Sequence, residues 1–305
     1  MVELAVHFRD GQALAAQKKF LASHRLQDIQ GPGPGSRGFE ERGWARLLGD
    51  LPPEALARPC ARLYLGSEFC PSLDEPGPGL GRALRLAQDS GFSATVVLGP
   101  VRQTVYARTL TWLRRLAPRR RGLEVVANDW GTLAGLAELG VEPVLGRLLF
   151  RVKRLPRLSR DTRPAPDTPR ARAILAAQLR ELSVFPGDIP WFAEFLRAAR
   201  VRRMDTELVP QGLRAARPGG LRISLHLPWT TVTGGGSCPV AGGPGRSSRC
   251  ARACRDACIL PRYPRQAYPM VQIGHTVFAW MAALAPAALR RGIYDRTVLE
   301  PGFPM

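Results

Sequence analysis

The sequence has little of what marks a membrane or secreted protein. No stretch reaches the roughly 18 apolar residues that a membrane-spanning helix needs, and the best candidate, at 276–286, is too short and ends in proline. The first residues, 1–7, have neither the basic nor the apolar segment of a signal peptide. We therefore expect a cytoplasmic protein, in which clustered cysteines bind metal or take part in redox chemistry rather than form disulfides.

Acidic residues and lysines are also scarce. The chain of 305 residues has 25 Asp and Glu against 44 Lys and Arg, a net charge of +19, and nearly all of the cations are arginine. This excess is typical of a solvated basic surface or a GC-rich coding sequence, and also of proteins that bind nucleic acid. Charge alone therefore leaves an RNA partner open without favouring it.

Histidine is rare, and the common hydrolase motifs are missing. The four histidines are His7, His24, His226 and His275, and no H-E-x-x-H or G-x-S-x-G occurs. The sequence therefore gives little support to a protease. His226 ends a predicted strand, where it is either an acid or base near a site or a hydrogen-bonded core residue.

Apolar, β-branched runs alternate with helical segments along the chain. Strands are predicted at 2–8, 61–66, 93–98, 123–127, 141–146, 202–207 and 221–226. The alternation predicts parallel βαβ units, so we expect an α/β fold: a TIM-like β/α barrel, complete or incomplete, with a C-terminal Cys-rich Fe–S segment.

We divide the chain at residue 233. Residues 1–233 form the barrel-like domain, with an exposed arginine- and proline-rich insertion at about 151–172. Residues 234–305 hold the Cys-rich loop and a helix predicted at 273–284, which complete the same domain.

Several polar residues and cysteines come just after predicted strands. Because function in such barrels gathers on the loops that follow the strands, these residues should share one face. They are Cys70, Asn128, Arg147, Glu207 and Cys238.

Four of the six cysteines lie in one window of the sequence. Cys238, Cys250, Cys254 and Cys258 have the spacing C-x11-C-x3-C-x3-C, within glycine-rich loops that can wrap closely round a bound group. Four thiolates are the usual ligands of an Fe4S4 cluster. Zinc is the competing metal, and a site without metal is the third alternative.

The other two cysteines differ in position. Cys70 follows its strand on the same predicted face and is a fifth candidate ligand, whereas Cys60 precedes that strand and is expected to be a buried hydrophobic residue.

Two pairs of polar residues have alternative roles. Asp205 and Glu207 alternate out of one strand, so they form either an acid–base pair or ion pairs with arginines such as Arg147. Asn128 and Asp129 either contact a substrate or cap the next helix.

Short motifs in the same order and spacing resemble the peptidase U32 family. They are Tyr64-Leu65-Gly66 followed by Cys70, Asn128-Asp129-Trp130-Gly131, Leu145-Gly146-Arg147-Leu148, and the G-R-S segment with two cysteines at 245–255. Together they extend from about residue 61 to 258. The G-R-S segment departs from the family pattern, because Arg249 stands where a glycine is expected.

The resemblance implies a barrel-like domain with an Fe4S4 cluster. In the family's smaller, ubiquinone-biosynthesis type of member, the matching ligands are Cys70, Cys238, Cys250 and Cys254, although the x11 gap is one residue shorter here. Cys258 is the alternative ligand.

The resemblance also implies an activity. Family members support oxygen-independent hydroxylation of a ubiquinone precursor or of RNA bases, and others are described as peptidases. We expect hydroxylation of a small aromatic substrate, with a second protein of the family as heterodimer partner. A peptidase, or a non-catalytic Fe–S protein for electron transfer or scaffolding, is the alternative.

Overall fold

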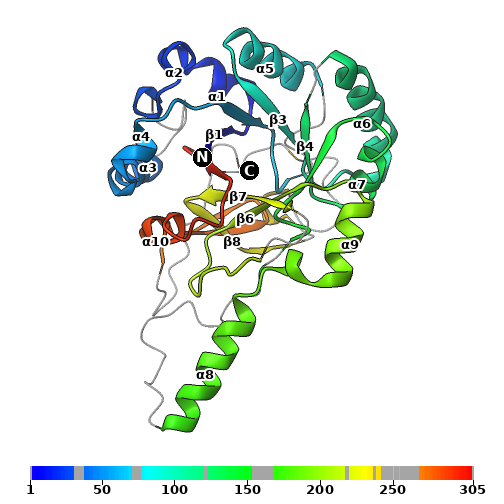
Figure 1. Ribbon diagram of the computed structural model, residues 1–305. Coiled ribbons are helices and arrows are strands. Elements are labelled where there is room, and N and C mark those ends of the chain that lie inside the picture. The colour runs from blue at the N-terminus through cyan, green and yellow to red at the C-terminus, as the bar shows by residue number, and fades with distance from the viewer. Residues whose placement is uncertain are drawn as a thin grey trace.

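The chain folds around a closed barrel of eight parallel strands, in the order β1-β11-β7-β6-β5-β4-β3-β2 (Figure 1). This computed structural model describes residues 2–30, 38–70, 77–119, 122–150, 152, 168–216, 220–235, 238–241, 250, 254 and 268–303. The predicted TIM-like α/β barrel is thereby confirmed, and the barrel is complete.

Short apolar runs form the barrel. The strands are β1 Glu3–Phe8, β2 Arg62–Leu65, β3 Ser93–Val97, β4 Glu124–Ala127, β5 Glu142–Leu145, β6 Arg203–Glu207, β7 Arg222–Leu227 and β11 Arg296–Leu299. The first seven coincide with the runs predicted from the sequence, because buried parallel strands are continuously apolar between polar ends.

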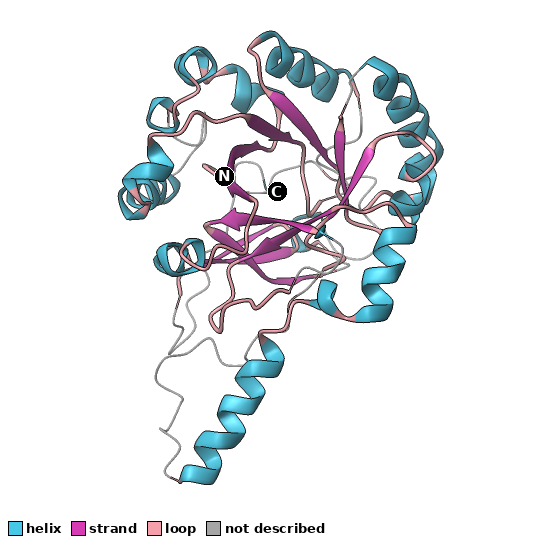
Figure 2. Cartoon of the chain, viewed as in Figure 1, coloured by secondary structure: helices cyan, strands magenta, loops and turns pink. Residues whose placement is uncertain are grey.

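Helices surround the strands on the outside (Figure 2). They are α1 Gly11–Ala15, α2 Lys18–Ser23, α3 Gly38–Asp50, α4 Pro53–Leu56, α5 Pro78–Asp89, α6 Gln103–Leu116, α7 Trp130–Leu136, α8 Pro169–Leu182, α9 Pro190–Ala198 and α10 Ala285–Leu289. Among the described helices, none is long and apolar enough to cross a membrane.

Amphipathic helices cover the barrel and bury its outer face. In α5, for example, Ala83, Leu84 and Ala87 are buried while the opposite side is solvated. Helix α8 is different, since it has no buried residue and extends away from the barrel (Figure 1). It begins inside the predicted insertion at 151–172; within that stretch, residues 151 and 153–167 lie outside the described residues.

The helix predicted at 273–284 is wrong. Strands β9 Met270–Ile273 and β10 Thr276–Trp280 occupy this segment and form a three-stranded antiparallel sheet with β8 Trp229–Gly234. Gly274, with φ 54°, makes the turn between β9 and β10. The aromatic and β-branched residues of β10 favour a strand over the helix that their apolar character first indicated.

The eighth barrel strand, β11, is a four-residue run that was not predicted from the sequence. It pairs with β7 on one side and with β1 on the other, so that Arg296 lies beside Glu3 and Leu299 beside Val6. The first and last strands of the fold therefore close the barrel together.

Candidate functional site

Alternate positions of the strands point into the barrel. Six of these inward residues, from six different strands, form an apolar cluster separate from the large core: Ala5, Tyr64, Val97, Val126, Val144 and Val298. Charged side chains lie on both sides of this cluster. We call those at the strand starts (Glu3, Arg62, Glu124, Arg203, Arg296) the lower layer, and those towards the strand ends (His7, Glu68, Arg147, Asp205, His226, Glu300) the upper layer.

The lower layer is a network of ion pairs. Arg296 donates to the two carboxylate oxygens of Glu124 at 2.6 and 2.9 Å, and to Glu3 at 2.7 Å. Arg62 donates to Glu3 at 2.9 Å. Burial alone would raise the pKa of Glu124, but Arg296, Arg62 and Arg203 lower it to about 2. These residues stay charged at neutral pH and fasten the strand starts to one another.

In the upper layer, Arg147 lies between two buried carboxylates. Its backbone N–H donates to Glu68 at 3.0 Å and its Nε donates to the same carboxylate at 2.7 Å. Its Nη2 lies 2.5 Å from Glu300 Oε1. Burial would raise the pKa of Glu300, but the charge of Arg147 and hydrogen bonds from two histidines hold it well below its usual range. Glu300 is therefore a buried carboxylate.

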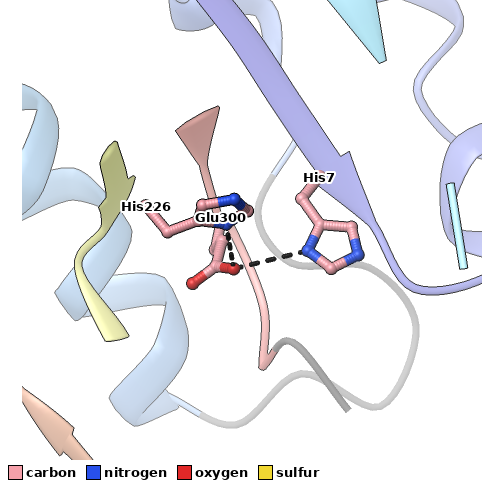
Figure 3. A group of neighbouring side chains, drawn as sticks. All are labelled: His7, His226 and Glu300. Carbon is pink, nitrogen blue, oxygen red and sulfur yellow. Dashed lines mark hydrogen bonds and ion pairs between the residues drawn. The ribbon is translucent and has the colours of Figure 1, made fainter. Parts of the chain in front are cut away.

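The two histidines converge on the same oxygen of Glu300 (Figure 3). His7 Nδ1 lies 3.3 Å and His226 Nδ1 lies 3.0 Å from Glu300 Oε1. All three residues are buried, and their ligand atoms lie within 4.8 Å of one another. The group therefore gathers two imidazole nitrogens and a carboxylate oxygen in one place.

The outer nitrogens of both rings face oxygen atoms, a hydrogen-bond acceptor for His7 and an ion-pair partner for His226. His7 Nε2 lies 2.7 Å from the carbonyl oxygen of Gly66, and His226 Nε2 lies 3.3 Å from Asp205 Oδ2. Burial and Arg147 lower the pKa of His226, but Asp205 and Glu300 outweigh them, so that its pKa is raised. Tyr64 donates to Asp205 at 3.3 Å and accepts from Arg296 at 2.7 Å, which joins the two layers.

Two glycines of the quoted motifs hold this geometry. Gly66 follows β2 with φ 129°, and a Cβ there would lie 2.1 Å from the carbonyl oxygen of Val97. A Cβ on Gly146, after β5, would lie 2.3 Å from Asn128 Oδ1. Only glycine fits these close approaches, which place the Gly66 carbonyl against His7 and direct Arg147 into the barrel.

Asn128 and Asp129 have structural partners. Asn128 donates to the Leu98 carbonyl at 2.9 Å and accepts from the Leu148 N–H at 3.0 Å. Asp129 is the N-cap of α7 and accepts from the Thr132 N–H at 2.7 Å. The sequence left substrate contact and helix capping open, and the structure shows Asp129 as a helix cap.

Asp205 and Glu207 point into the barrel from the same strand, as predicted. Asp205 faces His226, whereas Glu207 accepts from the backbone N–H of Thr231 at 2.7 Å. The strand thus brings Asp205 into the upper layer and uses Glu207 to fix the start of β8.

Four cysteines interact electrostatically. Burial first, and then the nearby Cys70, Cys250 and Cys238, raise the pKa of the Cys254 thiol to about 11. Cys70 and Cys254 pack with Phe69, Trp229 and Phe278 in one apolar cluster.

The remaining two cysteines are Cys60 and Cys258. Cys60 is fully buried, as expected, and burial raises the pKa of its thiol to about 12. Cys258 lies outside the described residues, and so does most of the G-R-S segment at 245–255.

Sequence reasoning did not assign His7, Glu68 or Glu300 to the site. Glu68 comes directly after the Tyr64-Leu65-Gly66 strand, a position that could have marked it. His7 is an inward position of the first predicted strand. Glu300 follows β11, the strand that was not predicted, so no sequence signal placed it there.

Comparisons with known proteins leave the function open. The sequence matches no protein-family model and no curated protein. The chain is similar to the structure of a Group IV chitinase from Ostrinia furnacalis, with 9% identity and a TM-score of 0.29 over 98% of this chain and 92% of the chitinase chain. The same chitinase with allosamidin gives 8% identity and a TM-score of 0.29 over 98% and 91% of the two chains. Similarity at this level carries no functional conclusion.

Proposed function

We propose that this chain is an Fe4S4 protein of the peptidase U32 type that supports oxygen-independent hydroxylation, of a ubiquinone precursor in the first place and of an RNA base in the second. The observation that carries the proposal is the proximity of four thiols: those of Cys70, Cys238 and Cys250 act electrostatically on Cys254. These are the four residues that the family resemblance selects as ligands, and Cys70 comes from a segment far from the other three in the sequence.

The donor set fits the cluster. Four cysteine thiolates are its usual ligands, and Cys70 and Cys254 are buried in an apolar environment that excludes water. When bound, the cluster would supply one-electron transfer. The twelve-residue and four-residue steps from Cys238 to Cys250 to Cys254 give three ligands, and Cys70 the fourth.

The chain connects the cysteine site to the upper layer. Glu68 and Phe69 immediately precede Cys70; Arg147 pairs with Glu68, and its guanidinium carbon lies 5.1 Å from the centre of the Phe69 ring. His275 lies in the turn between β9 and β10, and its Nε2 is 3.0 Å from the carbonyl oxygen of Phe69. In this proposal the upper layer holds acid and base groups beside the cluster, which favours an enzyme over a protein that only transfers electrons.

Iron and sulfide analysis after anaerobic purification tests the cofactor. We expect about four iron and four sulfide per chain, and their loss in Cys70→Ser, Cys238→Ser, Cys250→Ser and Cys254→Ser. Cys60→Ser, which changes a buried thiol of the opposite strand end, is the control and should retain the cluster. Cys258→Ser tests the alternative ligand. If the Cys258→Ser variant loses iron and the Cys70→Ser variant retains it, the fourth ligand is Cys258 and not Cys70. Zinc without sulfide would contradict the cluster.

Anaerobic growth of a deletion strain tests the activity. We expect the deletion strain to accumulate a quinone precursor that lacks a hydroxyl group. In the complemented strain, we expect a second protein of the same family to co-purify with this chain. Cleavage of casein by the pure protein, with normal quinone levels in the deletion strain, would instead favour the peptidase. A cluster-containing protein with neither phenotype would favour electron transfer or scaffolding.

A further inference from the structure

The group formed by His7, His226 and Glu300 has the spacing of metal ligands. Two ligand atoms about 2.0–2.2 Å from one ion, at angles between right and tetrahedral, lie about 3.0–3.5 Å apart. The two imidazole Nδ1 atoms lie 3.3 and 3.0 Å from Glu300 Oε1. Two of the three separations therefore match those around one transition-metal ion, and all three ligand atoms lie within 4.8 Å of one another.

The outer nitrogens of the two imidazoles point to the same conclusion. A carbonyl oxygen only accepts hydrogen bonds, so His7 Nε2, at 2.7 Å from the Gly66 oxygen, carries the proton. Asp205 Oδ2 lies 3.3 Å from Nε2 of His226, on the side of the ring away from Glu300. Nδ1 of each ring is thereby directed at Glu300 Oε1. An outer carbonyl or carboxylate partner, with the inner nitrogen directed at the metal, is typical of metal-binding histidines.

The charges of the upper layer leave room for a divalent ion. Among its described residues, Glu68, Asp205 and Glu300 are carboxylates and Arg147 is the guanidinium, so the carboxylates outnumber the arginine by two. Arg147 donates to Glu68 from its backbone N–H and from Nε, and these contacts remain when a metal occupies Glu300 Oε1. A buried excess of negative charge is costly unless a cation offsets it.

We infer that His7 Nδ1, His226 Nδ1 and Glu300 Oε1 bind a divalent transition-metal ion, of the kind that two histidines and a carboxylate select, such as Fe²⁺, Co²⁺ or Zn²⁺. The three ligands come from β1, β7 and the end of β11, on strands that are neighbours in the barrel. This site shares no ligand with the cysteines and does not depend on the function proposed for them.

Titration with Co²⁺ tests the site, in the Cys250→Ser chain so that the cysteine site contributes little to the spectrum. Absorption and metal analysis after desalting should give one Co²⁺ per chain, with bands typical of nitrogen and oxygen ligands. His7→Gln and His226→Gln should each lose that ion, whereas His24→Gln should retain it. His24 is the matched control, because its ring stacks on Phe92 and lies 2.9 Å from the Ser90 carbonyl, away from the barrel interior.

Asp205→Asn separates a metal site from a structural hydrogen-bond cluster. Because Asp205 lies behind His226 and is not itself a proposed ligand, its substitution should leave the stoichiometry unchanged and weaken Co²⁺ binding by about 10–100-fold. Equal Co²⁺ retention by the parent chain and by the His7→Gln/His226→Gln double variant would overturn the inference.

A measurement on the unsubstituted chain avoids dependence on the folding of these variants. With its accessible thiols alkylated, so that they neither bind nor reduce the metal, and then loaded with one equivalent of Cu²⁺, it should show the pulsed-EPR couplings of two imidazole nitrogens; their absence would also overturn the inference. The iron and sulfide content reports on the cysteines separately, so that either proposal can fail alone.

Discussion

The two charged layers of the barrel interior are built from the same residue types but have opposite charge balances. The lower layer sets three arginines against two glutamates, whereas the upper layer sets three carboxylates against one arginine and adds two histidines. An apolar cluster of small side chains and Tyr64 lies between them. The lower layer thus has an excess of one arginine over its glutamates, whereas the upper layer has an excess of two carboxylates over its arginine.

This difference agrees with the general division of labour in β/α barrels. Residues at the strand starts stabilise the barrel, and residues at the strand ends carry function. Here Arg296 illustrates the first role, since it bridges Glu3 and Glu124 across the strand starts. Glu300 follows the end of the same strand, β11, and in the inferred metal site it illustrates the functional role.

The largest expected effect comes from breaking the lower layer. Arg296→Met leaves Glu124 and Glu3 without their principal partner and should lower the free energy of unfolding by about 3–5 kcal/mol. Arg222→Met is the matched control, because its pair with Glu142, at 3.4 Å, is largely exposed and should contribute less than about 1 kcal/mol. Urea unfolding of both variants measures the difference. Equal losses would show that burial does not distinguish the two pairs.

Acid should act on the lower layer through Glu124. Its pKa in the folded protein is about 2, below the ordinary value of 4.5. A carboxyl with a lowered pKa stabilises the fold above pH 4.5, and this stabilisation is lost as the pH falls from about 4.5 to about 2. The difference corresponds to about 3 kcal/mol. Unfolding free energies measured between pH 6 and 3 should fall less steeply in Glu124→Gln than in the wild type; an identical slope would assign the acid sensitivity elsewhere.

Gly66 tests the support of the upper layer. In Gly66→Ala, the new Cβ would be placed at a positive φ and would clash with the Val97 carbonyl oxygen. We therefore expect the free energy of unfolding to fall by about 2–3 kcal/mol. Gly140→Ala has φ 68° but nothing within 4 Å, and should cost about 1 kcal/mol. Thermal unfolding compares the two. A similar loss of stability in both variants would mean that the backbone at the end of β2 can shift to accept a Cβ while the Gly66 carbonyl keeps its contact with His7.

The smallest effect is expected at a helix cap. Asp129→Ala should lower the unfolding free energy by about 1 kcal/mol, because it removes the N-cap of α7. Thr168→Ala removes the N-cap of α8, which has no buried residue, and should not change global unfolding measurably. Loss of activity in Asp129→Ala with unchanged stability would instead restore the substrate-contact role that the sequence left open.

Local sequence patterns predicted the fold well and the site only in part. Seven barrel strands follow from their apolar runs, and Cys70, Asp205, Arg147 and His226 follow from their positions near strand ends. The eighth strand has four residues and no clear pattern, so Glu300 could not be placed. The helix predicted at 273–284 failed because a short apolar run does not distinguish a buried helix from a strand. The meeting of His7 with Glu300 depends on barrel closure, which no local pattern contains.

Closure of the barrel by its first and last strands has a consequence for synthesis. His7 and Glu300 are 293 positions apart in the chain and meet only because β1 pairs with β11. During translation, most of the barrel strands and both His7 and His226 leave the ribosome before Glu300, their common partner, has been synthesised. A chain arrested before residue 296 would hold seven barrel strands and both histidines but neither β11 nor Glu300. If the inferred metal ion binds there, its retention would report that translation has passed Glu300 and that the barrel has closed.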